Sequence, residues 1–280
     1  MVNGVELFGQ PWVTVANGSG MLRGAALRSQ NLQVPGVHGE QLNVLQTYSA
    51  GSVVLPLVVQ GVDRATGDQV ADGTAQLRDN IRHLTRLFYA PTVTVVHEWP
   101  DGQRVRAVGR LRSDPVEGER WVSTPPAAQI NVALTIPTAF WEDVDPVVSA
   151  TYALASDETV QLTEFADATA PMDALLITFG PGSNPYLYQE GTDSVLAFRN
   201  IIESGRELLV DTAEWDLTDG QNGTVWEPDL RDLRYFPRAK WFELDPTVTP
   251  GGPVIRLEHS GGDDAMTVQI TARRKYQLGL

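Results

Sequence analysis

The chain lacks cysteine, and this absence removes several kinds of chemistry at once. With no Cys among its 280 residues, a disulfide scaffold, thiolate catalysis and Cys-ligated zinc are all excluded. Lysine is nearly absent too, because only Lys240 and Lys275 are present. Arginine therefore supplies nearly all of the positive charge. Arg forms bidentate, partly desolvated ion pairs better than Lys does, which favours protein interfaces, although a GC-rich genome produces the same bias. Both explanations remain open.

Long apolar runs are also missing. The longest, Val53 to Val59, is interrupted by Pro56 and is far shorter than the roughly 20 apolar residues of a membrane-spanning helix. Residues 1–10 show no basic segment followed by an apolar stretch, so we expect no signal peptide. Together with the lack of cysteine, this predicts a protein that is made in a reducing cytoplasm and has no membrane partner.

Negative charge is plentiful and unevenly spread. The net charge is −14; residues 1–150 carry 11 Lys+Arg against 14 Asp+Glu, and residues 151–280 carry 10 against 21. A nucleic-acid-binding protein gains affinity by neutralising phosphates with a basic patch. The acidic second half therefore argues against specific recognition of nucleic acid.

Length and apolar periodicity predict a mainly β protein with two domains. A chain of 280 residues with 42% hydrophobic residues can fill two cores. Acidic and small residues with Pro146 interrupt the pattern near residues 143–151, as in a linker. We therefore predict one domain over residues 1–146 and a second over residues 147–280.

The first domain is predicted to consist of strands and one helix. Four apolar residues fall at helical spacing, namely Leu77, Ile81, Leu84 and Phe88. Asp72 or Thr74 can cap the start of this helix, and Pro91 ends it. The apolar run Val53 to Val59 predicts a strand covered on both faces, with Pro56 at an edge or a bulge. Further strands are expected at residues 93–99, 103–112 and 129–136.

The second domain shows the alternation of a β-sandwich. Residues 254–259 and 266–273 alternate with period two around a Ser-Gly-Gly-Asp-Asp turn at residues 260–264, which predicts a hairpin with one buried and one solvated face. Short strand-like segments at residues 175–179, 207–211 and 241–244 complete the pattern.

No complete catalytic or metal-binding motif is present. His97-Glu98 matches half of a zinc-protease motif, but the second His is replaced by Asp101. The Gly-Ser segments lack the G-x-S-x-G spacing of a serine nucleophile. The acid pairs Asp211/Glu214 and Asp229/Asp232 make a glycosidase the third-ranked hypothesis, since most such acids are solvated surface residues. We therefore predict a protein that is not an enzyme and has no cofactor and no metal.

Two groups of arginines are the candidate interface residues. Arg78, Arg82 and Arg86 recur every fourth residue and form one stripe on the predicted helix. Arg104, Arg106, Arg110 and Arg112 share one face of the strand that follows Gly102. Three interpretations apply to both groups: a solvated polar face, a surface that meets carboxylates of a neighbouring subunit, or direct contact with DNA.

Aromatic residues suggest a rival function. Six of them could form a platform on which sugars stack: Trp121, Tyr186, Tyr188, Trp215, Trp226 and Trp241. Such residues more often fill a core or an interface. The alternative to a structural role is therefore a carbohydrate-binding module for recognition of a host surface.

The order of segments along the chain resembles that of a known family. Thr138-Ala-Phe-Trp-Glu142 precedes the linker, and Gly205-Arg-Glu-Leu-Leu-Val-Asp211 and Trp241-Phe-Glu-Leu-Asp-Pro246 lie before the last strands. Family members usually have Pro-Gly-Asn there, where this chain has Thr249-Pro-Gly-Gly-Pro253. In this order and spacing the chain resembles the distal tail protein family of bacteriophages with long, non-contractile tails, the siphovirus tail component family.

The resemblance implies an architecture and an assembly. It implies an N-terminal belt domain, a split barrel with one helix like that of tail-tube proteins, and a C-terminal galectin-like β-sandwich. Belt domains close as a homohexameric ring that connects the tail tube protein to the tail-tip hub and the adhesion apparatus. The tape measure protein and receptor-binding proteins are further candidate partners. The resemblance places the protein at the tail tip of the virion, where DNA passes through the channel without being recognised.

Overall fold

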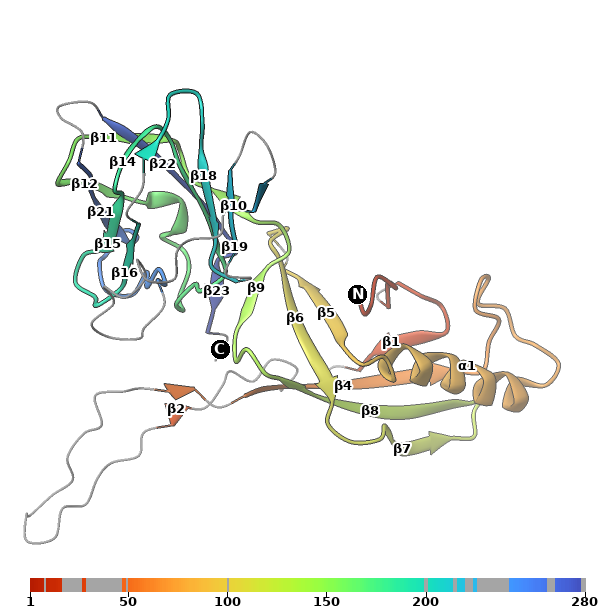
Figure 1. The fold of residues 1–280 in the computed structure, drawn as a ribbon. Coiled ribbons are helices and arrows are strands. Elements are labelled where there is room, and N and C mark those ends of the chain that lie inside the picture. The colour runs from red at the N-terminus through yellow and green to blue at the C-terminus, as the bar shows by residue number, and fades with distance from the viewer. Residues whose placement is uncertain are drawn as a thin grey trace, which may run out of the picture. The chain divides into compact units, whose positions relative to one another are not determined.

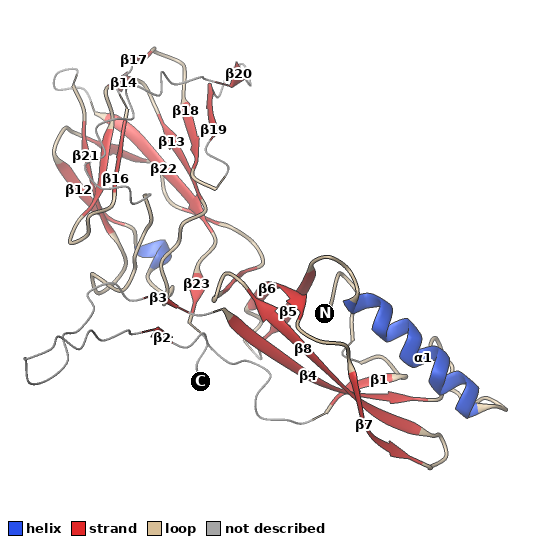
Figure 2. Ribbon diagram, turned by 60° about the horizontal axis from the view of Figure 1, so that its bottom comes forward, coloured by secondary structure: helices blue, strands red, loops and turns tan. Residues whose placement is uncertain are grey.

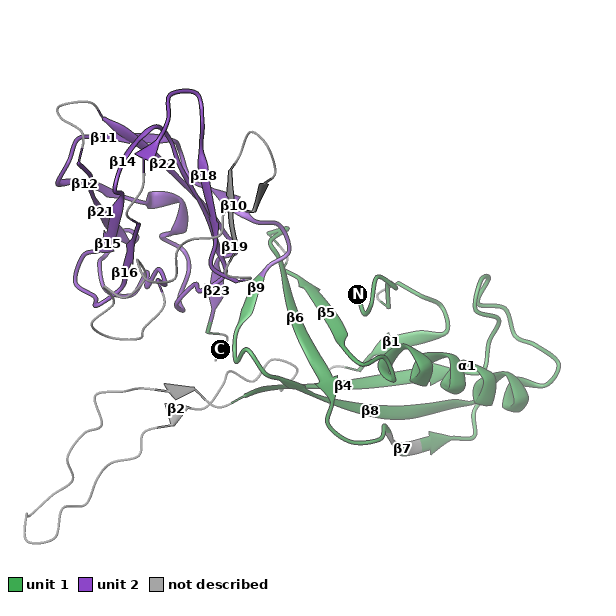
Figure 3. Ribbon diagram, viewed as in Figure 1, with its two compact units in different colours: residues 1–142, 277–280 green, residues 143–276 purple. Residues whose placement is uncertain are grey.

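Strands make up most of the regular structure, so the mainly β prediction is confirmed (Figures 1 and 2). The computed structural model describes residues 1–7, 9–16, 27–28, 47–48, 50–99, 101–198, 201–213, 216–219, 224–225, 242–260 and 265–277. Two compact units divide the chain, coloured separately in Figure 3: Met1–Glu142 with Gln277–Leu280, and Asp143–Tyr276. We call them unit 1 and unit 2 and describe each by itself.

Unit 1 is built on an open antiparallel sheet. Its elements are β1 (Val13–Val15), β2 (Leu27–Arg28), β3 (Thr47–Tyr48), β4 (Gly51–Gln60), α1 (Gly73–Phe88), β5 (Val93–Glu98), β6 (Arg104–Leu111), β7 (Val116–Trp121), β8 (Ala127–Ile136) and β9 (Trp141–Asp143). The strand order is β1-β4-β8-β6-β9, with β5 paired to β6 and β7 paired to β8, while β2 pairs with β3. Strands β4 and β8 pair along their full length, from Gly51 opposite Ile136 to Gln60 opposite Ala127.

Burial alternates along β4, so the prediction that both of its faces are covered is wrong. Val53, Leu57 and Val59 are buried, whereas the Val54 side chain between them is 39% exposed. The reason is that α1 covers only one face of the sheet. β4 lies between β1 and β8, but the pairing with β1 covers only Leu57 to Val59, so Pro56 lies just beyond it. Pro56 is tolerated where the β1 pairing ends, with its carbonyl accepting a hydrogen bond from the Ala16 N–H at 2.8 Å.

The helix α1 forms as the sequence predicts. The Asp72 carboxylate caps its start by accepting a hydrogen bond from the Ala75 N–H at 2.9 Å. Three apolar side chains are buried on one face, namely Leu77, Leu84 and Phe88. Asn80 is buried beside them and donates from Nδ2 to the carbonyls of Gln60 and Val62 at 2.8 and 2.9 Å, which ties the helix to the end of β4. In the part of the chain that the structure describes, no helix is long and apolar enough to cross a membrane.

Unit 2 is a β-sandwich. Its elements are β10 (Val147–Val148), β11 (Tyr152–Leu154), β12 (Glu158–Gln161), the 3₁₀ helix η1 (Thr163–Phe165), β13 (Leu175–Phe179), β14 (Gly182–Ser183), β15 (Tyr186–Gln189), β16 (Val195–Ala197), β17 (Ile201–Ile202), β18 (Leu208–Asp211), β19 (Asp216–Asp219), β20 (Thr224–Val225), β21 (Val254–Glu258), β22 (Met266–Ala272) and β23 (Lys275–Tyr276). One sheet has the order β10-β22-β13-β18-β19-β20 with β11 beside β22, and the other has the order β12-β21-β15-β16. Side chains from both sheets share one core, including Ile177, Phe179, Leu187, Leu257 and Val268.

The last two long strands do not form the predicted hairpin. β21 pairs with β12 and β15, whereas β22 pairs with β10, β11 and β13 in the other sheet. Both strands alternate as expected, because each buries one face in the same core. Alternation fixes which side chains point inward, but a sandwich offers two sheets in which the same pattern is satisfied. The intervening residues 261–264 lie outside the described ranges.

The first and last residues of unit 2 are joined by one buried carboxylate. Asp143 Oδ2 accepts a hydrogen bond from Arg274 Nε at 2.6 Å, and Oδ1 accepts one from the Tyr276 hydroxyl at 3.0 Å. The Asp143 N–H donates to the Arg274 carbonyl at 3.0 Å. Burial and the Asp143 charge raise the pKa of Tyr276, so its hydroxyl stays protonated and keeps donating. Asp143 therefore holds the two ends of unit 2 together.

We expect Asp143→Ala to destabilise unit 2 by about 3–5 kcal/mol, because it removes the acceptor of a buried hydroxyl and the nearer of the two carboxylates that meet a largely buried guanidinium. Asp167 offers a matched control, since it meets the same Arg274 at 3.1 Å with a side chain that is 81% exposed. We expect Asp167→Ala to cost less than about 1 kcal/mol. Differential scanning calorimetry of the full chain measures the loss of stability in both variants. Equal losses would contradict the conclusion that Asp143 holds the two ends of unit 2 together.

Candidate functional site

The arginine stripe of α1 faces solvent. Arg78, Arg82 and Arg86 are all exposed and lie on the side of the helix away from its buried apolar face. Within the described ranges none of the three forms an ion pair. The neighbouring Asp79 is already engaged, since its Oδ2 lies 3.0 Å from Arg64 Nη1. The stripe therefore presents three positive charges that no described carboxylate compensates.

The second group of arginines lies on β6. Val105, Ala107 and Gly109 are buried, and Arg104, Arg106 and Arg110 alternate with them, as the strand periodicity predicts. Arg112 follows the end of β6, and its N–H donates to the Ala133 carbonyl at 2.9 Å. Arg104, Arg110 and Arg112 are exposed, whereas Arg106 is half-buried.

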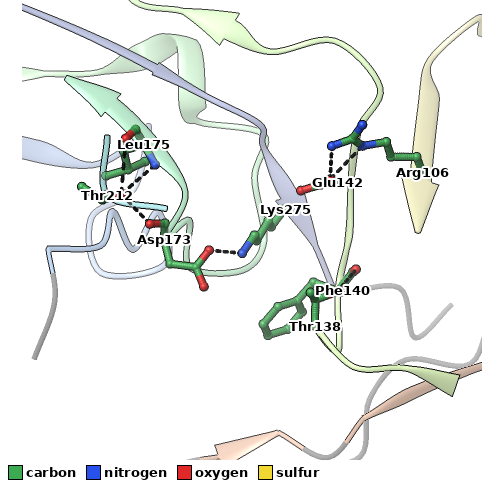
Figure 4. Close-up of polar contacts among 8 residues, drawn as sticks. All are labelled: Arg106, Thr138, Phe140, Glu142, Asp173, Leu175, Thr212 and Lys275. Atoms are coloured by element: carbon green, nitrogen blue, oxygen red, sulfur yellow. Dashed lines mark hydrogen bonds and ion pairs between the residues drawn. The ribbon is translucent and has the colours of Figure 1, made fainter. Parts of the chain in front are cut away.

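Arg106 already has a partner in its own chain (Figure 4). Its Nε and Nη2 lie 2.8 and 2.7 Å from Glu142 Oε1, and the two side chains are 32% and 22% exposed. This ion pair braces β6 against β9. The contact between Arg104 and Glu98 is weaker, because its 3.9 Å separation joins two well-exposed side chains. The group is thus divided between an internal brace and exposed charges.

The two groups point to opposite sides of unit 1. The β6 arginines alternate away from the buried face, and Arg110 stands opposite Thr135 of β8, also on the solvated face. Because α1 packs on the buried face and turns its arginines outward, its stripe lies beyond the other side of the sheet. Unit 1 therefore carries positive charge on two different surfaces.

The residues singled out for chemistry are not assembled into a site. His97 lies on β5, where its ring meets the Trp99 ring at 4.6 Å and burial lowers its pKa. His259 Nε2 lies 3.2 Å from the Leu154 carbonyl oxygen. Asp211 accepts a hydrogen bond from the Ala213 N–H at 2.8 Å, as in a turn. Glu214, Asp229 and Asp232 lie outside the described residues. In the described ranges no three His, Asp or Glu side chains are placed to hold a metal ion.

A polar network around the buried Lys275 explains the role of this rare lysine (Figure 4). Lys275 Nζ contacts the Asp173 carboxylate and is itself buried. The Asp173 carbonyl accepts a hydrogen bond from the Thr212 hydroxyl at 2.6 Å, and that hydroxyl accepts one from the Leu175 N–H at 2.8 Å. Lys275 therefore joins the end of unit 2 to the loop before β13 and is not part of a surface site.

Of the six aromatics, the structure brings Tyr186 and Tyr188 together on β15, with ring centroids 4.5 Å apart. Trp121 is half-buried at the end of β7. The other three, Trp215, Trp226 and Trp241, lie outside the described residues. Sequence reasoning missed Arg256, whose guanidinium carbon lies 4.7 Å from the centroid of the Tyr188 ring. Its alternation with Ile255 and Leu257 indicates a solvated position, but the pairing of β15 with β21 cannot be read from that pattern.

An open sheet unit with one covering helix, followed by a β-sandwich, defines a two-unit, mainly β protein. This fold is similar to the crystal structure of the SPP1 Dit (gp 19.1) protein, which is described as a paradigm of the hub adsorption apparatus in phages that infect Gram-positive bacteria. The similarity covers 98% of this chain and 97% of that chain, with a TM-score of 0.65 and 16% identity. The fold implied by the resemblance to distal tail proteins is therefore confirmed.

The other comparisons add nothing to this. A match to the structure of infectious bursal disease virus, Gx strain, covers 89% of this chain and 63% of that chain at 15% identity. Its TM-score of 0.14 is too low to indicate a shared fold. By sequence, neither a protein-family model nor a curated protein matches the chain.

The Arg106–Glu142 brace predicts a measurable coupling. A double-mutant cycle with Arg106→Ala and Glu142→Ala should give a coupling free energy of about 1 kcal/mol, because the pair is short and half-buried. The same cycle on the exposed pair Arg104 and Glu98 should give a value near zero. Urea denaturation of the full chain measures both couplings. Equal values would mean that distance and burial do not distinguish the two pairs.

Proposed function

We propose that this protein is a structural component of a bacteriophage tail tip, a distal tail protein with no enzymatic activity. The observation that carries the proposal is the similarity in fold to the SPP1 Dit protein over nearly the whole of both chains. A match that includes both units, in the same order, is more informative than a match to one sandwich, since sandwiches host many unrelated functions.

In this proposal the protein acts by assembly. Residues 1–146 form the belt of a homohexameric ring, and residues 147–280 form a galectin-like domain outside it. The ring connects the tail tube protein to the tail-tip hub and leaves a channel for DNA in the virion. A cyclic ring needs two different, complementary surfaces on each subunit. The exposed arginines on opposite sides of unit 1 support this arrangement, because one set can meet carboxylates of the next copy.

The mass of the assembly tests the proposed ring. Six copies of the 30.6 kDa chain have a mass of about 184 kDa. Light scattering should give this mass for the protein alone or once its tube and hub proteins are added, since a ring can require its neighbours to close. Particles that stay monomeric in the presence of both partners, or annular particles with another copy number in electron micrographs, would contradict the hexamer.

The arginine stripe of α1 should be required for assembly if it meets acidic residues of a neighbouring copy. We expect Arg78→Glu combined with Arg82→Glu to reduce the ring population at least tenfold and to leave the melting temperature nearly unchanged, because neither guanidinium has a described internal partner. Arg206→Glu in unit 2 is the control, since it reverses another exposed arginine. Sedimentation velocity measures the populations. Unchanged assembly would remove the stripe from the interface.

A further inference from the structure

Strands β12, β21, β15 and β16 form the second sheet of unit 2 (Figure 1). The solvated face of this sheet gathers an unusual set of side chains. Across the two central strands Tyr186 stands opposite Glu258, and Tyr188 stands opposite Arg256. On the other side Tyr186 stands opposite Ala197 of β16. All five side chains are half-buried and alternate with core residues, so their outer parts face solvent. They are supplied by three adjacent strands of one rigid sheet.

Arg256 is fixed over the Tyr188 ring. Its guanidinium carbon lies 4.7 Å from the ring centroid, a cation–π distance. Nη1 lies 3.0 Å from Asp157 Oδ1 and 3.5 Å from Glu258 Oε1, and Nε lies 2.9 Å from Glu190 Oε1. That buried Nε has no hydrogen bond of acceptable geometry, so the attraction to Glu190 is purely one of charge. Three carboxylates thus hold one guanidinium in place.

The phenol of Tyr188 is held as a hydrogen-bond donor. Its hydroxyl donates to Glu258 Oε2 at 3.3 Å. Burial raises its pKa well above the usual tyrosine value, with Tyr186 and Glu258 adding to the effect. The phenol therefore stays neutral at any physiological pH. Asp157, Glu190 and Glu258 keep carboxylate lone pairs beyond those that face Arg256, because each carboxylate offers about four acceptor positions.

The charge balance of this face selects the ligand. Three carboxylates against one guanidinium leave a local excess of negative charge, which disfavours phosphate, sulfate and other anions. A cation placed on Tyr188 would meet the guanidinium that already covers that ring. A neutral, hydroxyl-bearing ligand avoids both repulsions. Its hydroxyl groups can donate to the spare carboxylate oxygens, and its apolar C–H face can lie on the Tyr186 ring beside the small Ala197.

We propose that the face formed by Tyr186, Tyr188 and Arg256, with their three carboxylates, binds a neutral saccharide. This is a recognition function in unit 2, separate from ring assembly by unit 1. The proposal stands on residues of unit 2 alone, so it does not depend on the proposed function.

The experiment uses the full-length protein on an array of microbial polysaccharides that includes neutral, phosphorylated and sulfated members. We expect binding to at least one neutral glycan. Tyr186→Ala should reduce that signal at least tenfold, because it removes the half-buried ring on which the ligand lies, while Tyr186→Phe should keep most of it. Ala197→Arg should block the same face without removing any residue of the cluster. Tyr89→Ala is the control, since Tyr89 is 57% exposed in unit 1.

Each outcome bears on the proposal. Thermal melts separate loss of binding from loss of folding, and Ala197→Arg supplies the answer if Tyr186→Ala unfolds. The absence of any neutral glycan hit, binding that survives both Tyr186→Ala and Ala197→Arg, or a preference for anionic glycans would overturn it. If the two variants abolish assembly with tail proteins while no glycan binds, this face is a protein contact. Ring formation measured on the same samples tests the proposed function separately.

Discussion

Both units depend on one constraint: each long strand must bury one face and leave the other in water. Unit 1 satisfies it with a single sheet whose buried face is covered by Leu77, Leu84 and Phe88 of α1. Unit 2 satisfies it with two sheets that cover each other around Phe179 and Leu257. Among the described residues, one side of each main sheet is buried, and the side chains on the other side are half-buried or exposed. The arginines of β6 and the Tyr188–Arg256 cluster lie on these solvated faces, where a partner can reach them.

Pairing, rather than charge alone, separates the structural arginines from those available for binding. Arg106 and Arg274 each meet a carboxylate at less than 3 Å and join segments that are distant in sequence. Arg78 and Arg82 form no ion pair within the described ranges, although the same alternation and spacing rules place them. When the carboxylate partner of an arginine lies in the same chain, partial burial of that arginine costs little free energy. Arginines without such a partner gain more free energy by binding an acidic surface of another molecule. The sequence alone does not distinguish the paired arginines from the unpaired ones.

Features that depend on neighbouring residues in the sequence were predicted correctly. The spacing of apolar residues, the Asp72 cap and Pro91 located α1, and period-two alternation located the strands and their buried faces. Partner choice was not predictable in this way, because strands β21 and β22 carry the same alternation but belong to different sheets. Whether one or both faces of a strand are buried was not predictable either. An uninterrupted apolar run such as Val53 to Val59 is typical of a strand that is buried on both faces, yet only one face of this strand has a helix above it. The predicted interface arginines lie where periodicity places them, and their role in assembly stays a prediction.

Several contacts that shape unit 2 join residues far apart in the sequence, which explains why the sequence alone does not reveal them. Asp143 and Tyr276 are 133 residues apart, and Arg256 and Asp157 are 99 apart. The Asp143 contact has a structural consequence: because unit 2 begins and ends at one carboxylate, the two ends of this unit stay together while its strands pack around one core.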